Sequence, residues 1–258
     1  MARVLFLTQV LPYPPDAGPK VRQYHMLRYL AAQHEVTLVS FVRPDDRPEA
    51  IRHLQGICAS VHAVPMRRSL WRNLRAGLKG LVTGQPLVIA RDEIDQMRAT
   101  LDELTRQTDF DIIHADQLSM AGYGQRAAKN AATAATLLDE HNAVYLLTRQ
   151  LAARITHPVS RLMYDREARR MAVYEAAMCR AFEAVLTVTQ EDRDRLLALF
   201  SAQERDSLAR KFTVIPICVE PSQLAAPAAP SRSAGRFTIL HLGTMFWPPN
   251  VAGVLWFA

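Results

Sequence analysis

Two groups of polar residues that can exchange protons or hydrogen-bond a sugar lie in the middle of the chain. His114 and Asp116 end the segment FDIIHAD, and four consecutive polar residues end the segment TLLDEHN: Asp139, Glu140, His141 and Asn142. Ligands of open α/β sheets bind beyond the carboxyl ends of the strands. A lone histidine at a strand end is more often structural than catalytic, but two such groups at adjacent strand ends favour a site. Asn142 also suits the N-cap of the following helix.

A candidate phosphate site lies near the N-terminus, where the apolar segment Val4–Leu7 leads through the loop PYPPDAG into a helix. Free N–H groups and the helix dipole favour an anion at such a helix start. Gly18 permits a close backbone path, although without G-x-G-x-x-G it is a weak signal and can be only a turn glycine. Lys20 and Arg22 lie in the first turn, where the dipole disfavours cations. They are either surface residues or neutralise an anionic ligand, and we favour the second.

The elements that must position these residues alternate between strand and helix. Strands are predicted at 3–9, 35–42, 60–65, 110–115, 133–139, 184–188, 212–216 and 237–242. Helices are predicted at 19–33, 47–56, 69–82, 92–107, 118–131, 143–155, 158–182 and 190–200. The strands are continuous apolar runs, which is typical of a parallel sheet covered on both faces. The alternation predicts a doubly wound, Rossmann-like α/β sheet with right-handed crossovers.

The composition changes after residue 220. Residues 221–235, PSQLAAPAAPSRSAG, lack a hydrophobic rhythm and are predicted to be a linker after a domain at 1–220. Residues 236–258 then repeat the order of strand, glycine loop, proline turn and helix start. We expect them to begin a second Rossmann-like domain that the chain does not complete. The alternative is that this segment adds one more strand to the first sheet.

The overall composition is that of a soluble globular chain: 258 residues, 49% hydrophobic and 22% charged, with a formal net charge of +6. The positive excess is either solvated surface or indicates an anionic partner such as a diphosphate or membrane headgroups; no nucleic-acid partner is expected. Cys58, Cys179 and Cys218 show neither metal-ligand nor disulfide spacing. We therefore expect no metal, no cofactor and a cytoplasmic location. We expect neither a membrane-spanning run nor a signal peptide.

Two helical segments are rich in charge. SLWRNLRAGLKGLVTG, 69–84, has leucines on one stripe and is a candidate membrane-surface helix through its basic and indole side chains: Arg68, Trp71, Arg72, Arg75 and Lys79. An ordinary surface helix with its leucines in the core is the commoner alternative. In the long helix 158–182, Glu167 and Glu175 share a face. We expect surface ion pairs with neighbouring arginines for most of these charges.

An ordered set of segments spans nearly the whole chain: LPYPPDAGPKVRQYHMLRYLA, FDIIHADQLSMAGY, DEHN, RRMAVYEAAMCRAFEAVLTVTQEDRDRL, FTVIPICVEP and LHLGTMFWPPNVAGVLWFA. Together they resemble the N-terminal domain of family 4 retaining glycosyltransferases, which have two facing Rossmann-like domains, the GT-B fold. The bacterial sugar transferases of exopolysaccharide and exosortase systems are most similar. The resemblance implies a nucleotide-sugar donor, a glycan or lipid-linked acceptor and no metal.

The resemblance also implies roles for residues. The loop Asp16–Gly18 approaches the donor diphosphate, with Ala17-Gly18 in place of the family's paired glycines, and His141 matches the active-site histidine that contacts the donor sugar. VTQED, 188–192, matches the family's V-S-x-x-D. The expected donor-binding residues are Ala17, Gly18, Lys20, Gly243 and Thr244. The expected acceptor-side or cleft residues are Tyr13, Arg22, His114, Asp116, Asp139, Glu140 and Asn142.

The leading hypothesis is therefore a glycosyltransferase that moves a sugar from a nucleotide-diphosphate donor to an acceptor hydroxyl with retention of configuration. It would be cytoplasmic, with peripheral contact to the inner face of the membrane. The second hypothesis is a binding module or an inactive fragment, because the family's donor-binding E-x7-E lies beyond residue 258. A Rossmann-type epimerase or reductase is a third hypothesis, and the absence of G-x-G-x-x-G and Y-x-x-x-K argues against it.

Overall fold

The computed structural model describes residues 1–66, 80, 82–218, 239–241, 243, 245 and 248–258, which belong to two compact units, Met1–Val219 and Glu220–Ala258. The first unit contains seven strands: β1 (Arg3–Thr8), β2 (Glu35–Val42), β3 (Ser60–Pro65), β4 (Ile112–Asp116), β5 (Ala135–Glu140), β6 (Ala184–Thr187) and β7 (Phe212–Val214). Each lies within two residues of a predicted strand. The first seven predicted strands are therefore confirmed.

Nine described helices of this unit carry labels: α1 (Gly18–Ala31), α2 (Pro48–Gln55), α4 (Leu87–Arg91), α5 (Asp95–Gln107), α6 (Leu118–Asn130), α7 (Val144–Ala153), α8 (Pro158–Ala181), α9 (Gln190–Leu197) and α10 (Ala202–Ala209). The single helix predicted at 92–107 is wrong at its start. Buried Asp92 ends α4, and α5 begins at Asp95 after Ile94 donates its N–H to the Tyr123 hydroxyl. The helix predicted at 190–200 ends early, because Ser201 and Glu204 form a capping box that starts α10.

The sheet is entirely parallel, with the strand order β3-β2-β1-β4-β5-β6-β7. The chain builds outward from β1 to β3, then returns to the other side of β1 and builds outward again from β4. The order therefore reverses between β1 and β4. In open α/β sheets this topological switch point is where ligands bind, beyond the carboxyl ends of the strands.

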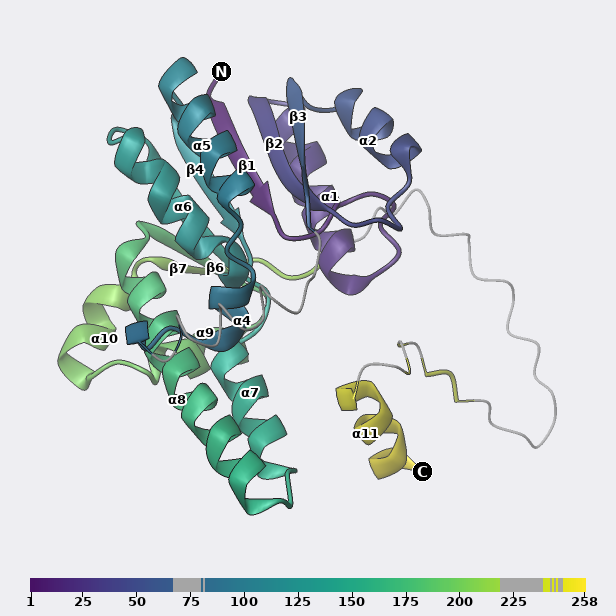
Figure 1. The fold of residues 1–258 in the computed structure, drawn as a ribbon, viewed down its shortest axis with the longest axis vertical. Coiled ribbons are helices and arrows are strands. Elements are labelled where there is room, and N and C mark those ends of the chain that lie inside the picture. The colour runs from purple at the N-terminus through teal and green to yellow at the C-terminus, as the bar shows by residue number, and fades with distance from the viewer. Residues whose placement is uncertain (67–79, 81, 219–238, 242, 244, 246–247) are drawn as a thin grey trace. The chain divides into compact units, whose positions relative to one another are not determined.

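Each face of the sheet has its own apolar core. Along β1, Leu5 and Leu7 pack with residues of α5, α6, α8 and α9, whereas Val4 and Phe6 pack with residues of α1 and α2. Successive side chains of a strand point to opposite faces, so a strand covered on both sides is apolar at consecutive positions. Figure 1 shows α5 and α6 on one side of the sheet and α1 and α2 on the other. The predicted doubly wound α/β sheet is confirmed.

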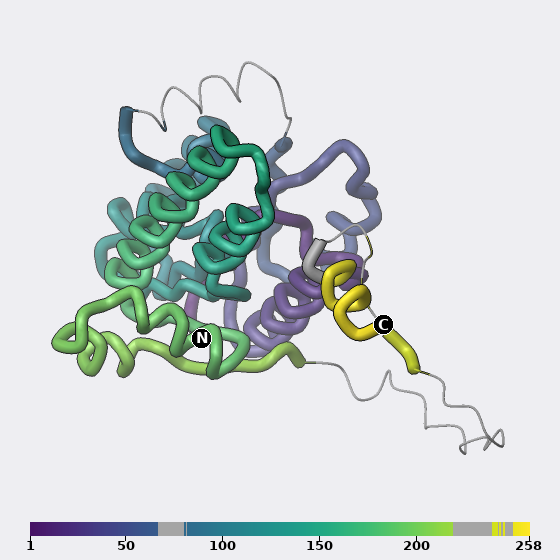
Figure 2. Tube along the Cα trace, turned by 90° about the horizontal axis from the view of Figure 1, so that it is seen from below, coloured from purple at the N-terminus to yellow at the C-terminus, as the bar shows by residue number. Residues whose placement is uncertain are grey.

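Helices α7 and α8 form an antiparallel pair that follows β5. They lie side by side in both Figure 1 and Figure 2, and α8 is the longest described helix at 24 residues. Only three residues, 141–143, separate the end of β5 at Glu140 from the start of α7 at Val144. The start of this pair is therefore fixed close to the carboxyl edge of the sheet.

The second unit contains helix α11, Pro248–Phe257. The strand predicted at 237–242 is not formed by the residues of it that are described, Ile239–His241. Ile239 and Leu240 are 71% and 87% exposed, so their apolar side chains have no sheet to enter. The predicted linker 221–235 and the candidate membrane residues Arg68, Trp71, Arg72, Arg75 and Lys79 lie outside the described residues, as does Thr244. None of the described helices is both long enough and apolar enough to cross a bilayer.

Candidate active site at the switch point

His141 follows β5 and lies against the end of β4. Its Nε2 is 3.0 Å from Oδ1 of Asp116, and its Nδ1 is 3.2 Å from the side-chain amide of Gln117. The side chain is only 8% exposed. Burial lowers the pKa of His141, but the charge and hydrogen bond of Asp116 outweigh burial and raise the pKa above its ordinary value. Two side chains therefore orient the imidazole, and Asp116 shifts its protonation equilibrium toward the cationic form.

Asp116 is held by groups from both sides of the switch point. Its Oδ1 contacts His141, and its Oδ2 accepts a hydrogen bond of 2.5 Å from Nε2 of Gln23 in α1. Gln117, the next residue, has a φ of 70° and donates its backbone N–H to the carbonyl of Asp139. Non-glycine residues seldom adopt this region, and such backbone strain is concentrated at functional sites. Hydrogen bonds from α1, β5 and His141 therefore fix the backbone and side chains at the end of β4.

Arg22 forms a buried ion pair at the end of β5. Its Nη2 and Nε lie 2.8 and 3.0 Å from Oδ1 of Asp139, and both side chains are at most 1% exposed. Its Nη1 donates to the carbonyl of Ile215, at 2.5 Å, just beyond β7. One guanidinium therefore connects α1, β5 and the backbone at Ile215, just after β7. Arg22 is therefore not a solvated surface residue, the first of the two sequence alternatives, and its charge is already paired with Asp139 within the protein.

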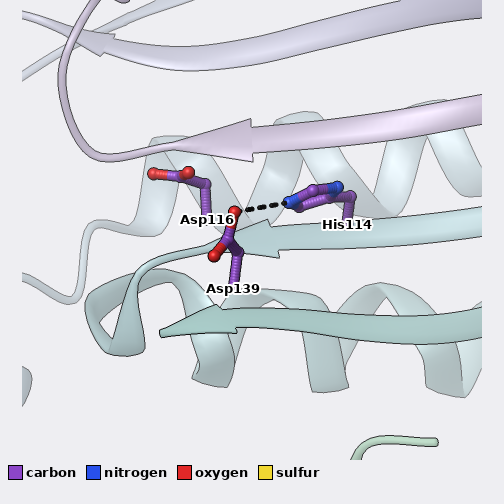
Figure 3. A group of neighbouring side chains, drawn as sticks. All are labelled: His114, Asp116 and Asp139. Atoms are coloured by element: carbon purple, nitrogen blue, oxygen red, sulfur yellow. Dashed lines mark ion pairs between the residues drawn. The ribbon is translucent and has the colours of Figure 1, made fainter. Parts of the chain in front are cut away.

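His114, Asp116 and Asp139 lie together on the face of the sheet that α1 covers. Figure 3 shows the three side chains at adjacent strand ends, with Nε2 of His114 3.8 Å from Oδ2 of Asp139. One ligand atom from each lies within 4.8 Å of the others, a spacing that suits a metal ion. Arg22 already neutralises Asp139, however, and the two carboxylate oxygens of Asp116 already contact Gln23 and His141. Both carboxylates therefore have protein partners, whereas Nε2 of His114 has no hydrogen-bond partner among the described residues.

Glu140 lies on the opposite face of β5, toward α8. Its side chain is buried, and neither carboxyl oxygen has a hydrogen-bond partner among the described residues. Burial, followed by the nearby charges of Glu175 and Asp139, raises its pKa well above the ordinary value. A carboxyl in this position is stable only when neutral. Glu140 is therefore a buried acid behind the site, not a carboxylate that faces a ligand.

The N-terminal loop ends at α1 without a side-chain cap. Ala17 is the N-cap residue, and Gly18 and Pro19 open the helix. Nothing lies within 4 Å of a Cβ placed on Gly18, and its φ is not in the left-handed region. Lys20 pairs with Asp16 at 3.1 Å. The fold of the described residues does not itself require a glycine at this position.

Two other predicted site residues lie outside the network around His141. The ring of Tyr13 stacks on that of His53 at 3.7 Å and packs on the α1–α2 core. Asn142 is exposed, and the prediction that it caps the next helix is wrong, because α7 begins at Val144 with Ala143 as its N-cap. A carboxylate from another element, Glu175, binds the first amides of α7 instead. That interaction removes the need for a local cap.

The structure thus brings five of the predicted residues into one network: Arg22, His114, Asp116, Asp139 and His141. Two further members, Gln23 and Gln117, were not singled out from the sequence, and Glu175 binds the backbone that follows His141. Glu175 was expected on the surface and is fully buried. Gln23 and Gln117 follow predicted site residues directly in sequence, at 22 and 116. That adjacency was the available signal.

Comparison with protein families shows which family contains the residues of this network. Residues 17–218 match the family of glycosyl transferase 4-like domains. The chain belongs to this family. The matched region begins at the α1 N-cap and ends just after β7, so it contains the entire His141 network of the glycosyl transferase 4-like domain. No curated protein matches the chain.

One solved structure shows the same fold, and a second superposes on this chain less closely. UGT2 of Phytolacca americana, solved with UDP-2fluoro-glucose and pterostilbene, superposes with a TM-score of 0.50 and 13% identity, covering 84% of this chain and 54% of that one. The lipopolysaccharide outer core galactosyltransferase WaaB, in its apo form, gives a TM-score of 0.48 and 11% identity, covering 90% of this chain and 50% of that one. The chain spans about half the length of these proteins. The fold is the α/β Rossmann-like type of GT-B glycosyltransferases.

Proposed function

We propose that this chain is the acceptor-side part of a glycosyltransferase that moves a sugar from a nucleoside-diphosphate donor to a hydroxyl group, with retention of configuration. The Asp116–His141 pair carries the proposal. It lies at the switch point of a parallel sheet, and its histidine has a raised pKa. Membership of the glycosyl transferase 4-like family and the GT-B type of fold support it further.

In this mechanism His141 contributes positive charge and a hydrogen bond near the anomeric centre. Negative charge develops on the diphosphate as it leaves, and donors that are already oriented stabilise it without reorganisation. Asp116 raises the pKa of the imidazole, which favours its protonated form, and fixes the direction of the ring. Arg22 does not supply this charge, because its guanidinium is bound to Asp139 and to the Ile215 carbonyl.

The diphosphate itself is assigned to the start of α1. The helix has no side-chain cap and no acidic residue in its first turn, so its N-terminal dipole is not compensated by the protein. Open space around Gly18 allows a phosphate to approach the backbone at Ala17 and Gly18. Lys20 adds a cation there. We also propose that Gly243 and Thr244, in the second unit, form a loop that binds the donor.

The acceptor is proposed to be a glycan or a lipid-linked sugar. A lipid-linked acceptor would place the reaction at the cytoplasmic face of a membrane. The basic segment that contains Arg68, Trp71, Arg72, Arg75 and Lys79 would then meet anionic headgroups.

The test is a transfer assay with the complete reading frame against a panel of nucleotide sugars. We expect one donor class to be used, and His141→Ala to lower kcat about 100-fold or more, as for the loss of one oriented donor. His157→Ala is the matched control, since His157 is exposed at the start of α8. Wild-type turnover in His141→Ala would remove the assigned role. No transfer by the wild type with any donor would favour the second hypothesis, a binding module.

A further inference from the structure

The backbone that follows His141 is held by two carboxylates from distant parts of the chain. Val144 and Tyr145 donate their N–H groups to Oε1 and Oε2 of Glu175, each at 2.7 Å. Ala143 donates its N–H to Oδ1 of Asp192, at 3.3 Å. Three consecutive amides, beginning two residues after His141, are thus bound from α8 and α9.

Contact with solvent does not explain why residue 175 is a glutamate. It is fully buried in α8, and no ion pair with it occurs among the described residues. A buried carboxylate is costly unless hydrogen bonds and charge compensate it. Its compensation comes from the two amides and from the positive end of the α7 dipole. An amide or an apolar residue would fill the same space, so the carboxylate points to a requirement at the start of α7.

The second carboxylate belongs to the segment VTQED. Asp192 binds Thr189 in two ways: its N–H donates to Oγ1 at 3.0 Å, and its Oδ2 accepts from Oγ1 at 2.5 Å. The Asp192 side chain that reaches Ala143 is therefore held by Thr189, the N-cap residue of α9. The Tyr145 hydroxyl also donates to the carbonyl of Arg195 at 3.0 Å, which ties α7 to α9 a second time.

We propose that Glu175 and Asp192 are positioning residues that set the orientation of His141 by holding the first amides of α7. The proposal rests on the proposed role of His141 in transfer. On its side-chain end, His141 is fixed by Asp116 and Gln117. On its main-chain end, only Asn142 separates it from the clamped amides. Both ends must be fixed, because a misplacement of about 1 Å can cost 100-fold in rate.

The contacts of Glu175 and Asp192 with the amides of residues 143–145, here called the clamp, also predict that transfer depends on pH. Groups that face Glu175 are Glu140 of β5, Tyr145 of α7, Asp192 of α9 and Cys179 of its own helix. Burial raises the pKa of Glu175 to about 7, although the two amides oppose this and the charge of Asp192 adds to it. Above that pH both oxygens accept as a carboxylate. Below it one oxygen carries a proton and the bond from an amide to that oxygen weakens.

The contributions of Glu175 to activity and to stability then change in opposite directions as pH rises. A raised pKa in the folded state favours folding while the group is protonated, so this contribution is complete below the unfolded value near 4.5 and is lost as pH rises through about 7. The clamp, by contrast, gains strength over the same upper range. The part of transfer that depends on Glu175 should therefore increase with pH through about 7, against the decrease that deprotonation of His141 causes, while the Glu175 contribution to stability declines. A purely structural role for Glu175 predicts no such opposition.

The test uses Glu175→Gln and Glu175→Asp in the complete protein, with Glu167→Gln as the control. Glu167 lies on the same helix and also accepts a helix-start amide, from Leu87 at 2.7 Å, but on α4. We expect Glu175→Gln to lower kcat about 10- to 100-fold with little change in KM, and to remove the limb of the pH–rate profile near 7. Glu167→Gln should leave both unchanged, and Glu175→Asp should recover part of the activity by restoring the charge.

A second measurement does not depend on turnover. In nuclear magnetic resonance titrations, the His141 ring signals should shift and broaden in Glu175→Gln but not in Glu167→Gln, with circular dichroism confirming that each variant is folded. Unchanged His141 signals in a folded Glu175→Gln protein would overturn the clamp. Shifted signals in a protein that transfers no sugar would leave the clamp standing and overturn only the proposed function.

Discussion

At the residue scale, the most demanding interaction is the ion pair between Arg22 and Asp139. Both side chains are buried, and Arg22 also binds the Ile215 carbonyl. Burial raises the pKa of Asp139, but the His114 ring and the Arg22 guanidinium outweigh burial and lower it to about 2. The folded value lies below the ordinary one, so the contribution to stability is present above about pH 4 and is lost as pH falls toward 2.

We predict that Arg22→Met lowers the free energy of unfolding by about 3 to 5 kcal/mol, because it leaves a buried carboxylate without its nearest cation. Adding Asp139→Asn should restore part of the loss, since the orphaned charge is then removed. Denaturant unfolding of both variants at pH 7 is the measurement. An equal loss in the single and double variants would mean that the Ile215 carbonyl, and not the ion pair, determines the cost.

At the scale of single elements, the glycine at the start of α1 is not required for the fold of the described residues, so its presence there is better explained by ligand binding. Gly18 opens this helix with ordinary backbone angles and open space around its Cα. Gly124 of α6 is the contrast, since a Cβ there would meet the Cβ of Ala115 and the Phe182 ring at 3.0 Å. Only the second glycine is required by packing among the described residues.

We therefore predict that Gly18→Ala leaves stability unchanged or raises it by up to about 1 kcal/mol, because alanine restricts the unfolded chain. In the complete enzyme the same change should raise KM for the donor, since a methyl group would stand where the diphosphate approaches the backbone. Gly124→Ala should destabilise the protein by overpacking. Unaltered donor KM in Gly18→Ala would remove the loop from the donor site.

The elements themselves were largely predictable from the sequence, and the network between them was not. Continuous apolar runs identified the central strands, because these are buried on both faces, whereas the edge strands β3 and β7 are only partly buried. Strand-end placement found His114, Asp116, Asp139 and His141 for the same topological reason. Glu175 was missed because its spacing from Glu167 is also that of a surface stripe. Only the fold shows that α8 turns this residue toward the amides of α7.

At the scale of the whole molecule, stability resides in the first unit. All seven strands and both apolar cores lie within Met1–Val219. In the second unit, none of the described residues is buried, and Leu255, Trp256 and Phe257 of α11 are 75%, 87% and 63% exposed. Large apolar side chains left in water in this way favour self-association.

We predict that residues 1–219 fold alone and unfold in one transition, with a Tm within about 2 °C of that of residues 1–258. A 2 °C shift corresponds to about 0.5 to 1 kcal/mol at this size, and a unit without buried described residues should contribute no more than this. Removal of residues 220–258 should also reduce self-association. Calorimetry gives the first result, and size-exclusion chromatography with light scattering gives the second. A Tm lowered by 10 °C would show that the second unit completes the core of the first, and the two units would then have to be treated as one folding domain.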